Sequence, residues 1–297
     1  MPRAAAHLTC LAAAVLVSAG CEVDLDAKTY SAREERRFTV SGRPALDLRT
    51  FDGTIDVRAW DRPEVRVTVE RRGDNEAVLK EIATRFSQDG NRITVEATGP
   101  SREARFGVGH FVGPSARLEV TVPSNADVTL FTKDGSVAVA GVTGTLDLRS
   151  GDGSITGEDL GGGITAHSDD GSITLSRVRG GAKVGTRDGS VRIRGVLTAL
   201  DVDTGDGSIV IDVADESRMA GDWRLHSGDG SITLGLPSAF DADLDARAGD
   251  GRVHVAHAAL AVSGSDEGAS LAGRMGQGGH RLTITTSDGS VHIRESR

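Results

Sequence analysis

The sequence predicts an all-β fold, a β-solenoid or single-stranded β-helix of two-strand coils of about 18 residues, with one short capping helix. Three observations predict it. The tetrad Asp-Gly-Ser followed by Ile or Val recurs along the chain, and five consecutive copies from Asp134 to Asp206 stand 18 residues apart. Apolar and polar residues alternate on both sides of each copy. A two-sheet β-sandwich would show the same alternation and is the alternative.

Each tetrad is predicted to be the turn between two strands. Glycine adopts positive φ easily, and aspartate hydrogen-bonds nearby backbone amides, so both are expected to be structural turn residues. With the looser versions "DGTI" and "DGRV", the turn pairs are Asp52 and Gly53, Asp134 and Gly135, Asp152 and Gly153, Asp170 and Gly171, Asp188 and Gly189, Asp206 and Gly207, Asp229 and Gly230, Asp250 and Gly251, and Asp288 and Gly289. A small, mostly hydroxylated residue stands two positions before each aspartate.

The alternation also predicts which residues are buried. Around Asp188, for example, Val184 and Ile193 are expected to face inward, whereas Arg187 and Arg192 face solvent. Trp223 occupies an inward position of its repeat. Because one coil cannot bury its own apolar face, the coils must stack.

Two segments break the repeat. The first, residues 60–123, contains the strand-like runs "EVRVTVERR" and "NRITVEA" around a helix predicted from about Asn75 to Phe86, with Asp74 as its cap. The apolar stripe of that helix consists of Val78, Leu79, Ile82 and Phe86. We expect the helix to cover the open sheet edge at the end of the solenoid.

The second break, residues 257–280, is rich in Gly, Ser and Ala. It is predicted to hold a degenerate coil around Asp266. Four apolar residues fall in phase with the repeat there, namely Leu260, Val262, Ala269 and Leu271.

The N-terminus has the layout of a secretory signal: Arg3, then an apolar stretch too short to span a bilayer as a helix. Its end, Ser18-Ala19-Gly20-Cys21, resembles a bacterial lipobox, although Ser18 replaces the usual larger aliphatic residue. We therefore expect Cys21 to be lipidated and to anchor the protein to the membrane. Cleavage after Ala19, giving a soluble periplasmic or secreted protein, is the alternative.

The predicted organisation is a lipoprotein signal peptide at 1–20, an N-terminal tether at 21–34, N-terminal strands with the capping helix at 35–123, and β-solenoid repeats at 124–297. Glu22 follows the lipidated cysteine in place of aspartate, which by resemblance to bacterial sorting rules favours the outer membrane. The protein is thus expected to be exported and lipid-anchored to the cell envelope.

The composition excludes several kinds of site. A net charge of -9 without a basic cluster excludes nucleic acid as a partner. Each turn offers one carboxylate, whereas calcium takes six to eight oxygens, so no specific metal is expected. The outward histidines are expected at different heights of the stack, and they are His167, His226, His254 and His292. No catalytic residue and no cofactor is predicted.

The run "LEVTVPSNADVTLFTKDGSVAVAGVTGTLDLRSGDGSITG" and the closing "LTITTSDGSVHI" resemble the bacterial putative-adhesin family, a domain family of unknown function. The resemblance covers most of residues 35 to 295. It implies an exported β-solenoid-like domain with an adhesive or envelope role. No catalytic residues come with it.

Together these features predict a non-enzymatic, lipid-anchored envelope protein that binds or scaffolds a protein or glycan ligand. One alternative is a glycan-active β-helix enzyme, which would show an aromatic-lined groove with clustered carboxylates. The other is an envelope-stress or assembly accessory protein that binds another protein.

Overall fold

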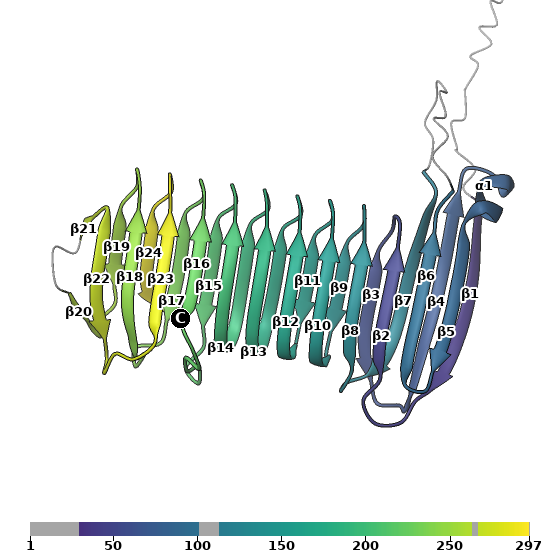
Figure 1. Ribbon diagram of the computed structural model, residues 1–297, viewed down its shortest axis with the longest axis horizontal. Helices are drawn as coiled ribbons and strands as arrows, with labels where there is room; N and C mark the ends of the chain where they lie inside the picture. The colour runs from purple at the N-terminus through teal and green to yellow at the C-terminus, as the bar shows by residue number, and fades with distance from the viewer. Residues whose placement is uncertain (1–29, 101–112, 263–266, 297) are drawn as a thin grey trace, which may run out of the picture.

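A computed structural model describes residues 30–100, 113–262 and 267–296, which form a rod of stacked strands (Figure 1). Strands that precede the turns make one long face of the rod, the leading face. They are β2 (Ala45–Thr50), β8 (Asp127–Thr132), β10 (Thr143–Ser150), β12 (Gly161–Ser168), the second halves of β13 (Ile173–Thr186) and β14 (Val191–Thr204), β16 (Trp223–Ser227), β18 (Ala242–Ala248) and β23 (Arg281–Thr286).

Strands that follow the turns make the other long face, the trailing face. They are β3 (Ile55–Trp60), β9 (Val137–Ala140), β11 (Ile155–Glu158), the first halves of β13 and β14, β15 (Ile209–Val213), β17 (Ile232–Leu236), β19 (Val253–Ala256) and β24 (Val291–Glu295). Each turn at the edge of the rod therefore joins the two faces of one coil.

Neighbouring coils pair in parallel and in phase with the sequence repeat. Leu146 on β10 lies beside Val128 on one side and Ile164 on the other, each 18 residues away. Corresponding residues of successive coils thus form rows along the rod. This pairing confirms the predicted solenoid rather than the sandwich.

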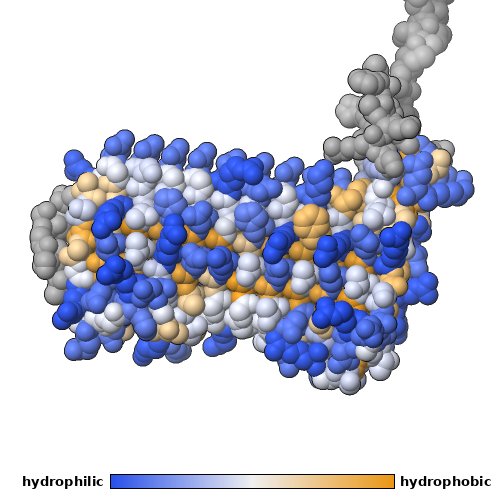
Figure 2. Space-filling model, viewed as in Figure 1, coloured by the Kyte–Doolittle hydropathy of each residue, from blue (hydrophilic) through white to orange (hydrophobic). Residues whose placement is uncertain are grey.

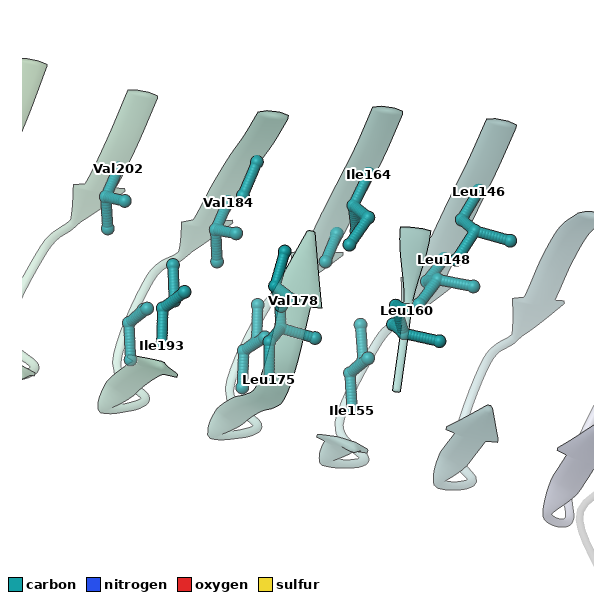
Figure 3. Close-up of a cluster of buried hydrophobic side chains, with 14 of the residues drawn as sticks. Leu146, Leu148, Ile155, Leu160, Ile164, Leu175, Val178, Val184, Ile193 and Val202 are labelled. Carbon is teal, nitrogen blue, oxygen red and sulfur yellow. The ribbon is translucent and has the colours of Figure 1, made fainter. Parts of the chain in front are cut away.

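The aliphatic rows of the two faces meet inside the rod. Val184 on the leading face and Ile193 on the trailing face are both buried, as predicted. Figure 3 shows this packing between coils, with Leu148, Val184 and Val202 from one face and Ile155, Leu175 and Ile193 from the other. Trp223 is also buried and packs on Phe240, with ring centroids 5.5 Å apart. Hydrophilic residues cover the long edges of the rod (Figure 2).

The spatial order of the coils differs from the sequence order at both ends. The last coil, β23 and β24, is inserted between the coil of β16 and β17 and the coil of β18 and β19. At the other end, β6 (Arg92–Thr98) and β7 (Ser115–Pro123) stack outside β2 and β3. The first tetrad, in the coil of β2 and β3, is therefore an inner rung that lies directly against β8 and β9.

Antiparallel strands close the N-terminal end of the rod. β4 (Glu64–Gly73) pairs with β7, β1 (Tyr30–Thr39) pairs with β4, and β5 (Ala83–Asp89) pairs with β6. The helix was predicted to cover the sheet edge at this end. Instead, the strands cover it, and helix α1 (Glu76–Glu81) packs at the corner against β1 and β4 (Figure 1).

Helix α1 is shorter than predicted, and its cap is a different residue. The Asn75 side chain, not that of Asp74, accepts the hydrogen bond from the Val78 amide, at 2.9 Å. The helix ends before Phe86, because residues from Ala83 onward pair one by one with β6 and this sheet pairing replaces the last helical turns. In the described part of the chain, no helix is long and apolar enough to cross a membrane.

The C-terminal end is closed by β20 (Leu260–Val262), β21 (Glu267–Gly268) and β22 (Ser270–Met275). β22 runs antiparallel to both β18 and β20. The prediction of a degenerate in-phase coil was therefore wrong, and Asp266 itself lies outside the described residues. The segment offers few large aliphatic side chains for an inward row. It reverses direction instead, and β22 pairs antiparallel with the free edge of β18.

Candidate functional site

Hydroxyl side chains tie each Asp-Gly-Ser turn to the turn of the preceding coil. Ser168 Oγ accepts a hydrogen bond from the Gly171 amide of its own turn at 3.0 Å and donates one to the Gly153 carbonyl of the neighbouring turn at 2.9 Å. The same two bonds recur at Ser150, Thr186, Thr204, Ser227 and Thr286. Ala248, the one position without a hydroxyl, belongs to the outermost repeat coil.

The turn glycines are needed for a different reason from the one the sequence suggested. Among the nine, only Gly53 has a positive φ, of 122°. However, a Cβ on Gly171 would lie 2.2 Å from the Gly153 carbonyl oxygen, and one on Gly153 would lie 2.0 Å from that of Gly135. The close approach of stacked turns, not a left-handed conformation, therefore requires glycine.

The aspartates of these turns follow one edge of the rod, where all but the half-buried Asp52 are exposed. Burial raises the pKa of the Asp52 carboxyl, and the negative charge of Asp134 in the next coil raises it further. Arg187 lies 3.5 Å from Asp170 and 3.4 Å from Asp169, and so offsets part of the edge charge. Within the described ranges, no three or more His, Cys, Asp or Glu residues group to hold a metal ion.

A shallow depression of ≈520 Å³ lies on the leading face over β12, β13 and β14. At its centre, Gly185 stands in register between His167 and Asp203 on the neighbouring strands. A Cβ at Gly185 would already lie 3.2 Å from His167 Nδ1. The His167 ring therefore leans over Gly185 and partly fills the gap that the missing side chain leaves in the row of outward residues. We call this place the Gly185 depression.

Charged groups of both signs border the Gly185 depression. Lys183 Nζ lies 3.3 Å from Asp201, and Asp169 lies 3.5 Å from His167 Nε2. These side chains remain close to half exposed or more, and Lys183 is 72% exposed. The border therefore offers both hydrogen-bond donors and acceptors in water, which suits recognition of a polar ligand more than chemistry in a dry pocket.

The outward histidines differ in one respect from the prediction. His254 and His292, expected at different heights, lie in register on adjacent strands, because the last coil is inserted next to β19. His226 contacts Thr285 Oγ1 at 2.9 Å, and His167 borders the Gly185 depression.

Two surface features on the leading face did not emerge from the sequence. Gly185 could have been noticed as a glycine at an outward position that polar residues otherwise occupy. Phe131 is 43% exposed and lies in register between Arg49 and Arg149. The sequence signal for Phe131 was an aromatic residue at the outward position that Gly185 occupies in its own repeat. The predicted lipidation site, Cys21, lies outside the described residues.

The geometry defines a class, the parallel two-faced β-solenoids with turns stacked along one edge. The sequence profile of the Toastrack DUF4097 family matches residues 44–294, and the chain belongs to this family, a domain family of unknown function. The resemblance drawn from the repeats is thereby confirmed. No curated protein matches the chain.

Several solved structures are similar to this chain. A "putative lipid binding protein" from Parabacteroides distasonis is 13% identical, with a TM-score of 0.46 over 88% of this chain and 96% of that one. A "putative adhesin" from the same species is 12% identical, with a TM-score of 0.45 over 91% and 98%. Another from Bacteroides fragilis is 12% identical, with a TM-score of 0.42 over 89% and 97%. Similarities this weak do not indicate a ligand for this chain.

Proposed function

We propose that the protein is a non-enzymatic binding or scaffold module of the bacterial cell envelope. The observation that carries this proposal is the Gly185 depression. It is a gap of one side chain on a paired parallel sheet, bordered by exposed Lys183 and Asp203 and by half-buried Asp201. A polar segment of a protein or glycan could hydrogen-bond to these groups with little rearrangement of the sheet, because every strand beneath is paired on both sides.

The surroundings of the depression favour binding over glycan cleavage. A glycan-active enzyme would have an aromatic-lined groove with clustered carboxylates, but the residues that line this depression include no Phe, Tyr or Trp. Trp223 is buried against Phe240. Trp60 is half-buried, with the guanidinium groups of Arg62 and Arg66 over its ring at 5.2 and 5.1 Å. Neither tryptophan offers a free platform for a sugar ring.

The binding proposal is tested by filling the gap. Mature wild-type protein is used to capture partners from an envelope extract, in parallel with Gly185→Arg and with Thr156→Arg, an exposed position on the trailing face. We expect a partner that wild type and Thr156→Arg retain and that Gly185→Arg loses at unchanged melting temperature. Equal capture by all three proteins, or no specific partner for wild type, would contradict the proposal.

The anchoring part of the proposal rests on Cys21. A diacylglycerol on its sulfur and an acyl chain on its freed amine would together give stable membrane attachment, which a single chain does not. We place the protein at the outer membrane because Glu22 follows the cysteine. Mass spectrometry of the mature N-terminus is expected to show a lipidated Cys21, and an unmodified start at Gly20 would contradict anchoring.

A further inference from the structure

Two imidazole rings lie stacked on the trailing face near the C-terminal end of the rod. His254 on β19 and His292 on β24 are in register on adjacent parallel strands. Their ring centroids are 5.2 Å apart and their planes differ by 8°. His292 is exposed and His254 is half-buried, so both rings can be reached from solvent.

The other described histidines have polar partners, whereas this pair does not. His226 contacts Thr285, buried His257 contacts the Pro237 carbonyl at 2.9 Å, and His280 lies 3.7 Å from Asp222. Among the side chains that the structure describes, none makes a hydrogen bond to the ring of His254 or His292. Glu267 stands in register with His254 on the antiparallel strand β21. Their ring nitrogens are therefore available to a ligand.

The neighbouring cation is directed away from the pair. Arg294 stands two residues after His292 on β24, and its guanidinium lies 2.5 Å from Asp212 on β15. This contact spans the intervening strand at Gly235, where a Cβ would lie 2.7 Å from Asp212 and 3.0 Å from Arg294. Asp212 also binds Arg194, at 3.3 Å. The arginine charge is thus held on the side of His292 opposite to His254.

We propose that His254 and His292 together bind one divalent transition-metal ion, such as Zn²⁺, Ni²⁺ or Cu²⁺, with water in the remaining positions. Neutral imidazole is a good ligand for these ions. Metal–nitrogen bonds of about 2.0–2.1 Å place two nitrogens on one tetrahedral ion roughly 3.3 Å apart. The rings stack nearly parallel at 5.2 Å, so both side chains must change rotamer for the ring-plane lone pairs to converge on one ion at this separation.

Binding requires both imidazoles to be unprotonated, because a protonated ring has no free lone pair. Affinity is therefore expected to fall as the solution is acidified, because protons compete with the metal ion for the ring nitrogens. The calcium ion prefers oxygen ligands and is expected not to bind. The pair lies on the face opposite to the Gly185 depression, so the two sites can be tested separately.

The site is tested by titrating the mature protein with ZnCl2 in a calorimeter at pH 7.5. We expect one ion per chain, and no detectable binding by His254→Ala or His292→Ala. His280→Ala, which removes an exposed histidine beside Asp222, is the control and should bind as wild type does. Matching melting temperatures without metal would show that the variants are folded.

A second measurement identifies the ligands directly. The electron paramagnetic resonance spectrum of one equivalent of Cu²⁺ should show coupling to two imidazole nitrogens in wild type, and this two-nitrogen coupling should be absent in either variant. No zinc binding at millimolar concentration, or binding that persists unchanged in both variants, would overturn the site.

Discussion

The glycine of each Asp-Gly-Ser turn lies against the turn of a neighbouring coil with no room for a side chain. At Gly189, an added Cβ would lie 2.2 Å from the Gly171 carbonyl oxygen, and at Gly207 it would lie 1.9 Å from that of Gly189. The aspartate before each glycine faces solvent at most positions. At the scale of single residues, the close backbone contact between stacked turns is therefore what requires the glycine of the tetrad. The carboxylate of the aspartate matters less to the fold.

Gly171→Ala tests this steric requirement. The added methyl group would overlap the Gly153 carbonyl, and such overpacking costs about 1–3 kcal/mol of stability. Gly163→Ala is the matched control, because a Cβ there meets nothing within 4 Å. We expect chemical denaturation to show a clear loss of stability for Gly171→Ala only. Equal effects of the two substitutions would contradict close approach as the cause.

The raised pKa of Asp52 predicts a pH-dependent effect at the same edge. Burial and the charge of Asp134 favour the protonated carboxyl in the folded state. The stabilising contribution of the protonated Asp52 carboxyl is fully present below the pKa that this group has in the unfolded chain. It is lost as the pH rises through the pKa of the folded protein, so ionised Asp52 lowers the free energy of unfolding at neutral pH. Asp52→Asn should therefore melt at a higher temperature than wild type at pH 7 and show little difference near pH 3.

Asp229→Asn is the control for this comparison, because Asp229 is an exposed aspartate of the same repeat. Its effect on melting at pH 7 should be smaller. A lower melting temperature of Asp52→Asn at pH 7 would show that the carboxylate stabilises the turn instead.

The long strands β13 and β14 show how one element serves both faces. β13 runs on the trailing face at Ile173 and on the leading face at Thr186, and it bends between them at Arg177 and Gly180, with φ of 51° and 137°. Arg177 also pairs with Asp159 of the preceding coil, which has the same left-handed conformation, at φ 52°. At the scale of the element, the alternation of apolar and polar residues sets which side chains are buried. The bend between the two faces lies where residues with left-handed conformations stack in successive coils.

Val184→Asp tests the phase of β13. Val184 is 2% exposed, so the substitution would bury an unpaired carboxylate and should destabilise the fold by several kcal/mol. Arg192→Asp, at an exposed position on β14, should change stability by about 0.5 kcal/mol or less. Urea denaturation of both variants makes the comparison. Similar losses would mean that the inward and outward rows are assigned wrongly.

At the scale of the whole molecule, both ends of the rod are closed by chain that departs from the repeat. The C-terminal coil is an inner rung, and β18 with its antiparallel partner β22 forms the outer one. The N-terminal end is closed by β1, β4 and β5, all antiparallel to their neighbours. Leaving fewer open parallel edges reduces the risk of end-to-end association of rods.

Engineered disulfides test the order of the coils. Arg224 on β16 and Asp245 on β18 each lie in register with Thr283 on β23. In a Cys21→Ser background, Arg224→Cys with Thr283→Cys should oxidise readily, because adjacent rungs lie within disulfide range. Arg224→Cys with Asp245→Cys should not, because two rungs span roughly 9.6 Å. Non-reducing electrophoresis distinguishes the pairs, and the opposite result would mean that the coils stack in sequence order.

The coil length, the turn positions and the inward rows could all be predicted from the amino-acid sequence. These are local or periodic properties: alternation about one turn fixes which face is buried, and a constant 18-residue spacing fixes the register of successive coils. The sequence also marked the hydroxylated residue two positions before each aspartate, although it did not reveal the two hydrogen bonds that this hydroxyl makes. The helix was found but overextended, because the pairing of Ala83 onward with β6 is a long-range contact that propensity cannot reveal.

The order of the coils in space could not be predicted in this way, since every repeat presents similar edges and many orders satisfy the same local pattern. That order brings His254 beside His292. The steric need for glycine also appeared only in the structure, because it depends on the distance to another coil. The Gly185 depression is likewise a relation between three strands, His167, Gly185 and Asp203 being 18 residues apart in sequence and side by side in space.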